Sequence, residues 1–186
     1  MTLLSDYKKQ QKLAWARVQP HLWFTPFSVL HTLDHVRSEY FADLSATVHL
    51  YFVNRGPLAC VVHEDSLATI YIHQVLNHSD TPAEVASLIC KHELLHIRIP
   101  PVVEGKTTIQ HPPEFWEAEK AITPERTLAW LWIWHNLGWC LKRRPRLKRI
   151  DVLPNWRHLW SRPMLDLAGC RQLLPELSEE TEEVVW

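Results

Sequence analysis

Glycine is scarce in this sequence, with four residues among 186, and the four cysteines include no closely spaced pair. Without a C-x-x-C pair, the chain has neither the zinc-ribbon pattern nor a thioredoxin-like redox motif. The wide spacing is also unlike the dense disulfide framework of a small secreted domain. We therefore expect free thiols in a reducing, cytoplasmic setting, buried as small apolar side chains: Cys60, Cys90, Cys140 and Cys170.

The sequence also has no long apolar run, and its net charge is close to zero. Its longest strongly apolar run, residues 129–134, is far shorter than the roughly 20 residues that a membrane-spanning helix needs. The start, MTLLSDYKKQQKLAW, lacks the continuous apolar core of a signal peptide. Twenty basic and 21 acidic residues give a net charge of -1, so no overall field attracts the chain to nucleic acid or to a membrane. We expect a cytoplasmic protein without a membrane partner.

What is present is an ordinary share of hydrophobic residues, 46%, with an excess of histidine (12) and tryptophan (10). The length suits one domain, which we place at residues 1–175, followed by an acidic tail at 176–186. Within the domain we expect a core at about 46–122 and a helical, tryptophan-rich extension at 123–175. We interpret most of the tryptophans in that extension as packing residues.

The pattern of apolar residues predicts an α+β fold. Helical spacing extends from residue 27 to 44, and β-branched or aromatic runs follow at 47–53, 58–63 and 67–75. The segment Asn54-Arg55-Gly56-Pro57 separates the first two runs, which predicts a small three-stranded antiparallel sheet. Further helices are expected at both ends of the chain, including one that begins at Pro112-Pro113 and one that begins at Thr123-Pro124.

The helix after the sheet has the clearest start signal. Thr81 is the expected N-cap, Pro82 the first helical residue, and Glu84 the partner that completes a capping box. The helix should extend to about residue 99, where Pro100-Pro101 ends it.

This helix contains the sequence His92-Glu93-Leu94-Leu95-His96. Two histidines four residues apart lie on one face of a helix, so both imidazoles can reach one Zn²⁺. Glu93 points toward the side of that site, where its carboxylate can take the proton of a water that the metal activates. This H-E-x-x-H arrangement is typical of zinc peptidases, and it predicts one zinc ion per chain. The competing interpretation is that both histidines are core residues and that Glu93 lies on a solvated face.

A catalytic zinc normally has three protein ligands. His111, fifteen residues beyond His96 at a loop-to-helix junction, is the first candidate for the third ligand. The alternatives lie on the following helix: Glu114, Glu117 and Glu119.

The run H-E-L-L-H, a short linker and then H-P-P-E-F-W together resemble the signature of the SprT-like and YgjP-like metallopeptidases. The resemblance covers roughly residues 67–121. It implies a compact zincin core, with His92, His96 and His111 as zinc ligands and Glu93 as general base. It also implies that Phe115 and Trp116 pack the second helix.

The resemblance further implies an edge strand at residues 69–74 that binds an extended peptide by β-addition. Thr69, Tyr71 and His73 are then the expected substrate-binding residues. The sequence departs from the family pattern in three ways. The linker contains Pro100-Pro101 and Gly105 and lacks the residues that usually precede the third ligand. The chain also has no four-cysteine zinc ribbon, and the region after Thr123 matches no pattern of the family.

A basic segment follows at residues 142–162, with eight basic residues and one acidic residue. Basic side chains interleaved with tryptophans suit contact with phosphates and bases of a single strand. The alternative is a solvated helix end beside tryptophans that cover the core. The residues of the possible DNA contact are Lys142, Arg143, Arg144, Arg146, Lys148 and Arg149.

These patterns together predict a zinc metallopeptidase that acts on a protein or peptide. The alternative function is a nucleic-acid-associated protein whose zinc site is structural or weakly active.

Overall fold

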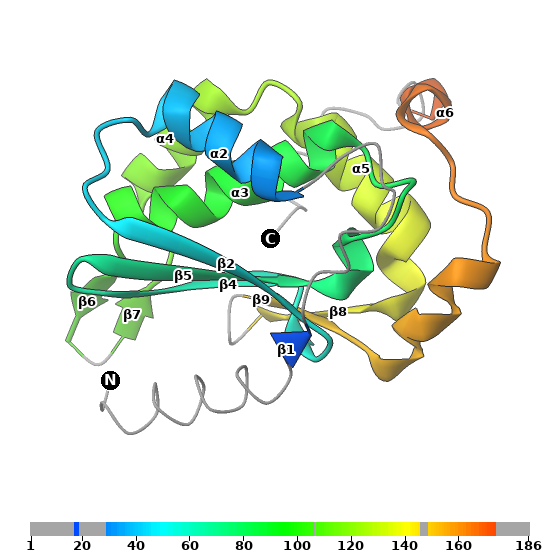
Figure 1. Ribbon diagram of the computed structural model, residues 1–186, viewed down its shortest axis with the longest axis horizontal. Coiled ribbons are helices and arrows are strands. Elements are labelled where there is room, and N and C mark those ends of the chain that lie inside the picture. The colour runs from blue at the N-terminus through cyan, green and yellow to red at the C-terminus, as the bar shows by residue number, and fades with distance from the viewer. Residues whose placement is uncertain (1–16, 19–28, 106, 146–148, 174–186) are drawn as a thin grey trace.

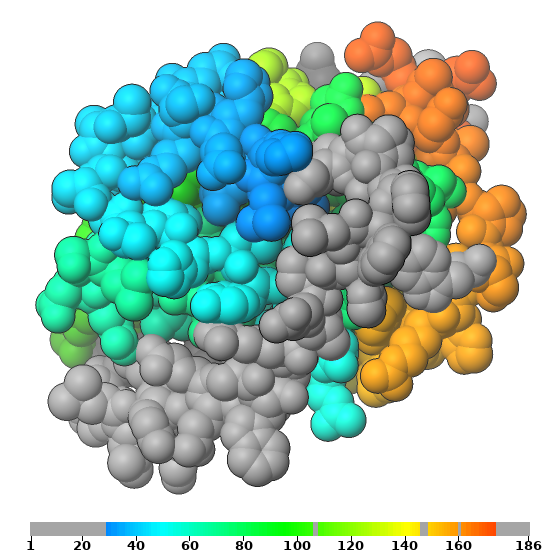
Figure 2. All heavy atoms as spheres, viewed as in Figure 1, coloured from blue at the N-terminus to red at the C-terminus, as the bar shows by residue number. Residues whose placement is uncertain are grey.

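The computed structural model describes residues 17–18, 29–105, 107–145 and 149–173. They form an α+β arrangement in which a layer of helices covers one face of a sheet (Figure 1). The fold class is therefore as predicted. The helices of this layer are α2 (Val29–Tyr40), α3 (Ala83–Arg98), α4 (Pro113–Ile122) and α5 (Arg126–Leu137). Helix α2 lies on the outside of the molecule, above the sheet (Figure 2).

The main sheet is mixed rather than antiparallel. Its strands follow the order β1 (Arg17–Val18), β2 (Thr47–Val53), β5 (Leu67–His73) and β4 (Ala59–Glu64). Strands β2 and β5 are parallel, whereas β4 is antiparallel to β5 and β1 is antiparallel to β2. The prediction of a three-stranded antiparallel sheet is wrong, although all three predicted strands form.

The physical reason for this error lies at Gly56. Its φ of 114° turns the chain out of the sheet, so residues 54–57 do not form the hairpin that the sequence suggested. Instead β3 (Gly56–Pro57) pairs with β9 (Arg149–Val152), which pairs in turn with β8 (Leu141–Arg144). The predicted tryptophan-rich extension therefore contributes two strands as well as helices. Residues 174–186, and the predicted acidic tail with them, lie outside the described residues.

Shorter elements connect these layers. After α3 the chain forms an antiparallel hairpin, β6 (Val102–Glu104) and β7 (Thr107–Ile109), which lies near one end of the main sheet (Figure 1). The remaining elements are η1 (Gln74–Leu76), η2 (Gly138–Cys140), η4 (Pro154–Ser161) and α6 (Leu167–Gln172).

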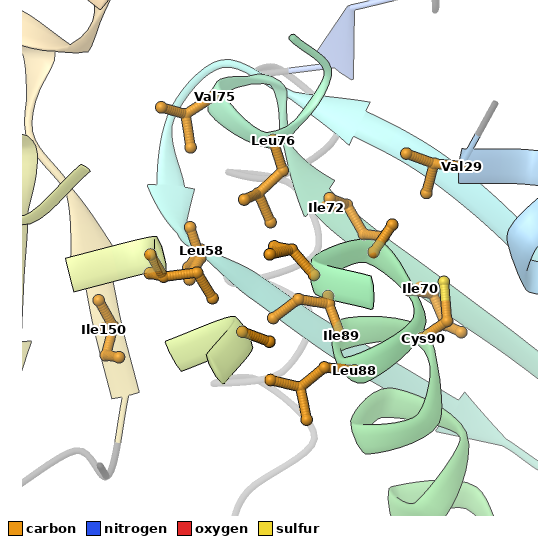
Figure 3. Packing of buried hydrophobic residues seen from close by; sticks show 14 of the residues in the cluster. Val29, Leu58, Ile70, Ile72, Val75, Leu76, Leu88, Ile89, Cys90 and Ile150 are labelled. Carbon is orange, nitrogen blue, oxygen red and sulfur yellow. The ribbon is translucent and has the colours of Figure 1, made fainter. Parts of the chain in front are cut away.

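Helix α3 lies at the centre of the hydrophobic core. Leu88 and Ile89 of α3 belong to the same buried cluster as Ile70 and Ile72 of β5 (Figure 3). Trp130 and Trp132 of α5 are 1% and 0% exposed, which confirms the packing role expected for these two tryptophans. The four cysteines are free thiols, as predicted. Because eleven of the sixteen residues of α3 are buried, this helix is a rigid support for the side chains it carries.

The start of α3 differs in detail from the predicted capping box. Pro82 is the N-cap, with an extended ψ of 150°, and the helix begins at Ala83. Thr81 is thus one residue too far from the helix to cap it. Its buried hydroxyl oxygen has no hydrogen-bond partner among the described residues. Glu84 lies in the first turn, where its negative charge interacts favourably with the helix dipole.

Candidate metal centre

Helix α3 carries His92, Glu93 and His96 in the order that the sequence predicted. The rings of His92 and His96 have their centroids 4.9 Å apart, as expected for residues one helical turn apart on one face. His92 is only 2% exposed, whereas His96 is half-buried. The site therefore lies at the boundary between the core and the surface.

The third histidine comes from a different segment. His111 follows the β6–β7 hairpin and directly precedes α4, and its Nε2 lies 3.2 Å from Nε2 of His92. Its ring centroid is 4.7 Å from that of His96. One nitrogen from each of the three histidines lies within 4.8 Å of the others, so this group could hold a metal ion.

The donor set fits zinc. Four ligands at about 2.0–2.1 Å in a tetrahedron have neighbouring donor atoms about 3.4 Å apart. This is close to the 3.2 Å between Nε2 of His92 and Nε2 of His111. Imidazole is a preferred zinc ligand, and three histidines are one of the ligand sets of catalytic zinc. Among the described residues, the group that meets the spacing for a metal contains His111 and no glutamate. Glu114 and Glu117 are exposed on α4.

Glu119, the remaining alternative, occupies a different position beside the site. Its Oε1 lies 2.6 Å from Nδ1 of His92, on the side of the ring away from His111. Its Oε2 accepts a hydrogen bond of 2.8 Å from Nε of Arg126 at the start of α5. Burial raises the pKa of the Glu119 carboxyl, but the hydrogen bonds and charges of His92 and Arg126 outweigh it, so the pKa lies below its usual range.

This role of Glu119 was not predicted from the sequence. The available signal was its spacing of four residues from Phe115, which places both side chains on the inner face of α4. Both are buried, Phe115 at 0% and Glu119 at 1% exposure.

The ring of Phe115 packs against all three histidines. Its ring centroid lies 5.0 Å from that of His92, 4.6 Å from His96 and 4.8 Å from His111. Trp116, the next residue, has its ring centroid 4.8 Å from that of His111 on the more exposed side. The aromatic pair that the sequence assigned to packing thus contacts the histidines directly.

Glu93 is 4% exposed and lies next to His92 in the sequence. Its position also affects the thiol of Cys90, one turn earlier in α3. Burial raises the pKa of that thiol, and the charge of Glu93 raises it further. Both effects favour the neutral thiol, and among the described residues the group with metal-ligand spacing consists of the three histidines.

The predicted substrate-binding strand is not an edge. Strand β5 lies between β2 and β4, so its backbone groups are paired on both sides. Thr69 is half-buried, Tyr71 is 5% exposed and His73 is 0% exposed. An extended peptide cannot add to β5. The prediction was wrong because it paired β2 with β4 in a hairpin, which would have left β5 at the edge of the sheet.

Among its described residues, the basic segment contains most of β8, all of β9 and the short helix η4. Lys142 and Arg143 are exposed on β8, and Arg143 stacks on Trp134 with its guanidinium carbon 4.5 Å from the ring centroid. Arg144 and Arg149 both pair with Asp151, at 3.0 and 2.8 Å. Arg146 and Lys148 lie outside the described residues. The DNA contact stays a prediction, and two of its proposed cations are already paired with a carboxylate.

Comparisons with protein-family models, with curated proteins and with solved structures found no match for this chain. The resemblance to the SprT-like and YgjP-like metallopeptidases is therefore limited to the two motifs that carry it. Among the described residues, no helix has both the length and the apolar character to cross a membrane.

Proposed function

We propose that this chain is a zinc-dependent peptidase that hydrolyses peptide bonds. One arrangement carries the proposal: His92, His96 and His111 converge around one point, and Glu93 follows His92 on the same buried helix. The ligands on α3 have the i, i+4 spacing of H-E-x-x-H zinc enzymes, and the third comes from a separate segment.

The type and exposure of the ligands favour a catalytic over a structural site. Structural zinc sites are closed and usually rich in cysteine thiolates. Here the three ligands are histidines, and His96 and His111 are half-buried rather than enclosed. Water and a substrate therefore have a side from which to approach.

In this proposal His92, His96 and His111 hold the zinc ion. Zinc would supply Lewis-acid chemistry, lowering the pKa of water and polarising the carbonyl that is attacked. Glu93 accepts the proton of the attacking water and later delivers it to the leaving amine. Phe115 keeps the inner side of the site dry, which strengthens the electrostatic interactions at the reacting atoms.

The Glu93→Gln variant tests this role. The variant keeps the size of the side chain and all three histidines, so it should bind zinc as tightly as the wild type. Because it loses the proton acceptor, cleavage of an unfolded protein such as casein should fall about 10²- to 10⁴-fold.

Glu117→Gln is the matched control, since it makes the same change at an exposed position of α4. It should keep full activity. Wild-type protein loaded with zinc that cleaves no unfolded protein or peptide would contradict the proposed function. Cleavage by Glu93→Gln at the wild-type rate would contradict the role of Glu93.

A further inference from the structure

The two ring nitrogens of His92 face different partners. Nδ1 lies 2.6 Å from Oε1 of Glu119, and Nε2 lies 3.2 Å from Nε2 of His111. An ionised carboxylate can only accept a hydrogen bond, so the proton of a neutral His92 ring lies on Nδ1. The lone pair then lies on Nε2, the nitrogen that faces the other two histidines.

Glu119 is itself fixed on its other side. Arg126 donates from Nε to Oε2 of Glu119 at 2.8 Å, and the carboxylate is 1% exposed. The backbone carbonyl of Glu119 accepts hydrogen bonds from the backbone N–H of Thr123 at 3.0 Å and from its hydroxyl at 2.6 Å. The side chain that holds His92 is therefore anchored at the junction between α4 and α5.

A second ion pair holds the same junction against α3. Lys91, the residue before His92, lies 2.9 Å from Oε1 of Glu125, the residue before Arg126. Lys91 is 4% exposed. Two adjacent residues of α3 are thus tied to two adjacent residues at the start of α5, one directly and one through Glu119.

We propose that Glu119, held by Arg126, is a positioning residue that orients His92 for zinc. The inference rests on the proposed metal site and names a residue that acts on it without touching the metal. A carboxylate on the distal nitrogen of a histidine ligand fixes the tautomer and the orientation of the ring and makes it a stronger ligand. The loss of such a partner typically weakens metal affinity 10- to 100-fold.

The experiment measures zinc affinity by competition with a chromophoric chelator for the wild type, Glu119→Gln and Arg126→Met. Glu119→Gln keeps the shape of the side chain but loses its charge, and we expect zinc to bind at least tenfold more weakly. Arg126→Met leaves the carboxylate in place but removes its anchor, so we expect a smaller loss in the same direction. Glu117→Gln, on the exposed face of α4, should bind zinc as the wild type does.

A purely structural role is distinguished by a second measurement. In ¹⁵N NMR spectra of the metal-free protein, the His92 ring should be the Nδ1–H tautomer in the wild type and a mixture of tautomers in Glu119→Gln. Wild-type affinity and an unchanged tautomer in a folded Glu119→Gln variant would overturn the inference. If Glu119→Gln does not fold, wild-type zinc affinity in Arg126→Met would overturn it.

The outcomes separate this inference from the proposed function. If the wild type binds zinc and Glu119→Gln binds it equally tightly, Glu119 has no positioning role, and the peptidase proposal is unaffected. If the wild type binds zinc but cleaves no peptide, and Glu119→Gln binds zinc more weakly, the peptidase proposal is wrong and the positioning role of Glu119 stands.

Discussion

At the scale of single residues, the two glutamates beside His92 have different proposed tasks. Glu119 is buried in contact with Arg126 and His92, which lowers the pKa of its carboxyl and keeps it charged as a hydrogen-bond acceptor. Glu93 lies beside His92 on α3 at 4% exposure, and in the proposed mechanism it moves a proton.

His73 is a buried histidine away from the metal centre, and it gives a prediction for the stability of the fold. Burial lowers its pKa to about 4, and the positive charge of Arg157 acts in the same direction. In the unfolded chain the pKa of a histidine is about 6.5. Between pH 6.5 and 4 the unfolded chain therefore binds a proton that the folded chain does not.

This stabilising effect is fully present above about pH 6.5 and is lost as the pH falls toward 4. The difference of pKa corresponds to about 3 kcal/mol in the free energy of unfolding. Urea unfolding of metal-free protein at pH 4.5, 5.5 and 7 should show this loss in the wild type and a shallower one in His73→Asn. In the wild type, Nδ1 of His73 accepts a hydrogen bond from the backbone N–H of Val75. The side-chain oxygen of asparagine can accept the same hydrogen bond.

His63→Asn, at an exposed position of β4, is the control and should follow the wild-type pH dependence. The same pH slope in His73→Asn as in the wild type would show that His73 does not contribute to it.

The motif residues were predictable because they depend on local periodicity. A spacing of four residues on a helix fixes the side that His92 and His96 share, whatever the rest of the chain does. The contact between Glu119 and His92 joins residues 27 positions apart, so it depends on how α4 packs against α3. The spacing of Glu119 from Phe115 indicates the inner face of α4, but it does not indicate which residue Glu119 contacts there.

At the scale of elements, the strand order moves the expected peptide-binding edge from β5 to β4. Strand β4 ends the main sheet on its side within the described residues, and helix α3 packs against it. A substrate that adds to this edge would lie beside the helix that carries Glu93. Such binding depends on backbone hydrogen bonds.

Backbone methylation of a substrate tests this edge. In a peptide that the protein cleaves, one N-methyl group two residues from the scissile bond should raise KM about tenfold, which is roughly the effect of one hydrogen bond. The value of kcat should change little. Methylation at a terminal residue of the same peptide serves as the control, and equal KM values for both peptides and the parent would contradict binding at β4.

The helices were predicted better than the strand pairing for a physical reason. Helices α3 and α4 begin within two residues of the predicted starts because prolines and apolar spacing act locally. Pairing of β2 with β5, and of β3 with β9, joins distant segments, and Gly56 has a positive φ at the point where the chain leaves β2 for β3. The strands β8 and β9 were missed because each has only four residues and because Leu141 is the only buried residue of β8.

At the scale of the whole molecule, the site combines three separate parts of the chain. Helix α3 provides two histidines and Glu93, the end of the β6–β7 hairpin provides His111, and the α4–α5 junction provides Glu119 and Arg126. A metal that binds only when these parts are assembled favours the folded state over the unfolded one. A metal ion held at this site would therefore stabilise the packing of the helical layer.

Zinc binding by the purified chain is the most direct test of the central claim. Protein prepared without chelators and then titrated with zinc should bind one ion per chain. His92→Ala, His96→Ala and His111→Ala should each lose it, whereas the control His135→Ala, at an exposed position of α5, should keep it. A wild-type chain that takes up no zinc, or a His92→Ala variant that binds it as tightly as the wild type, would contradict the account.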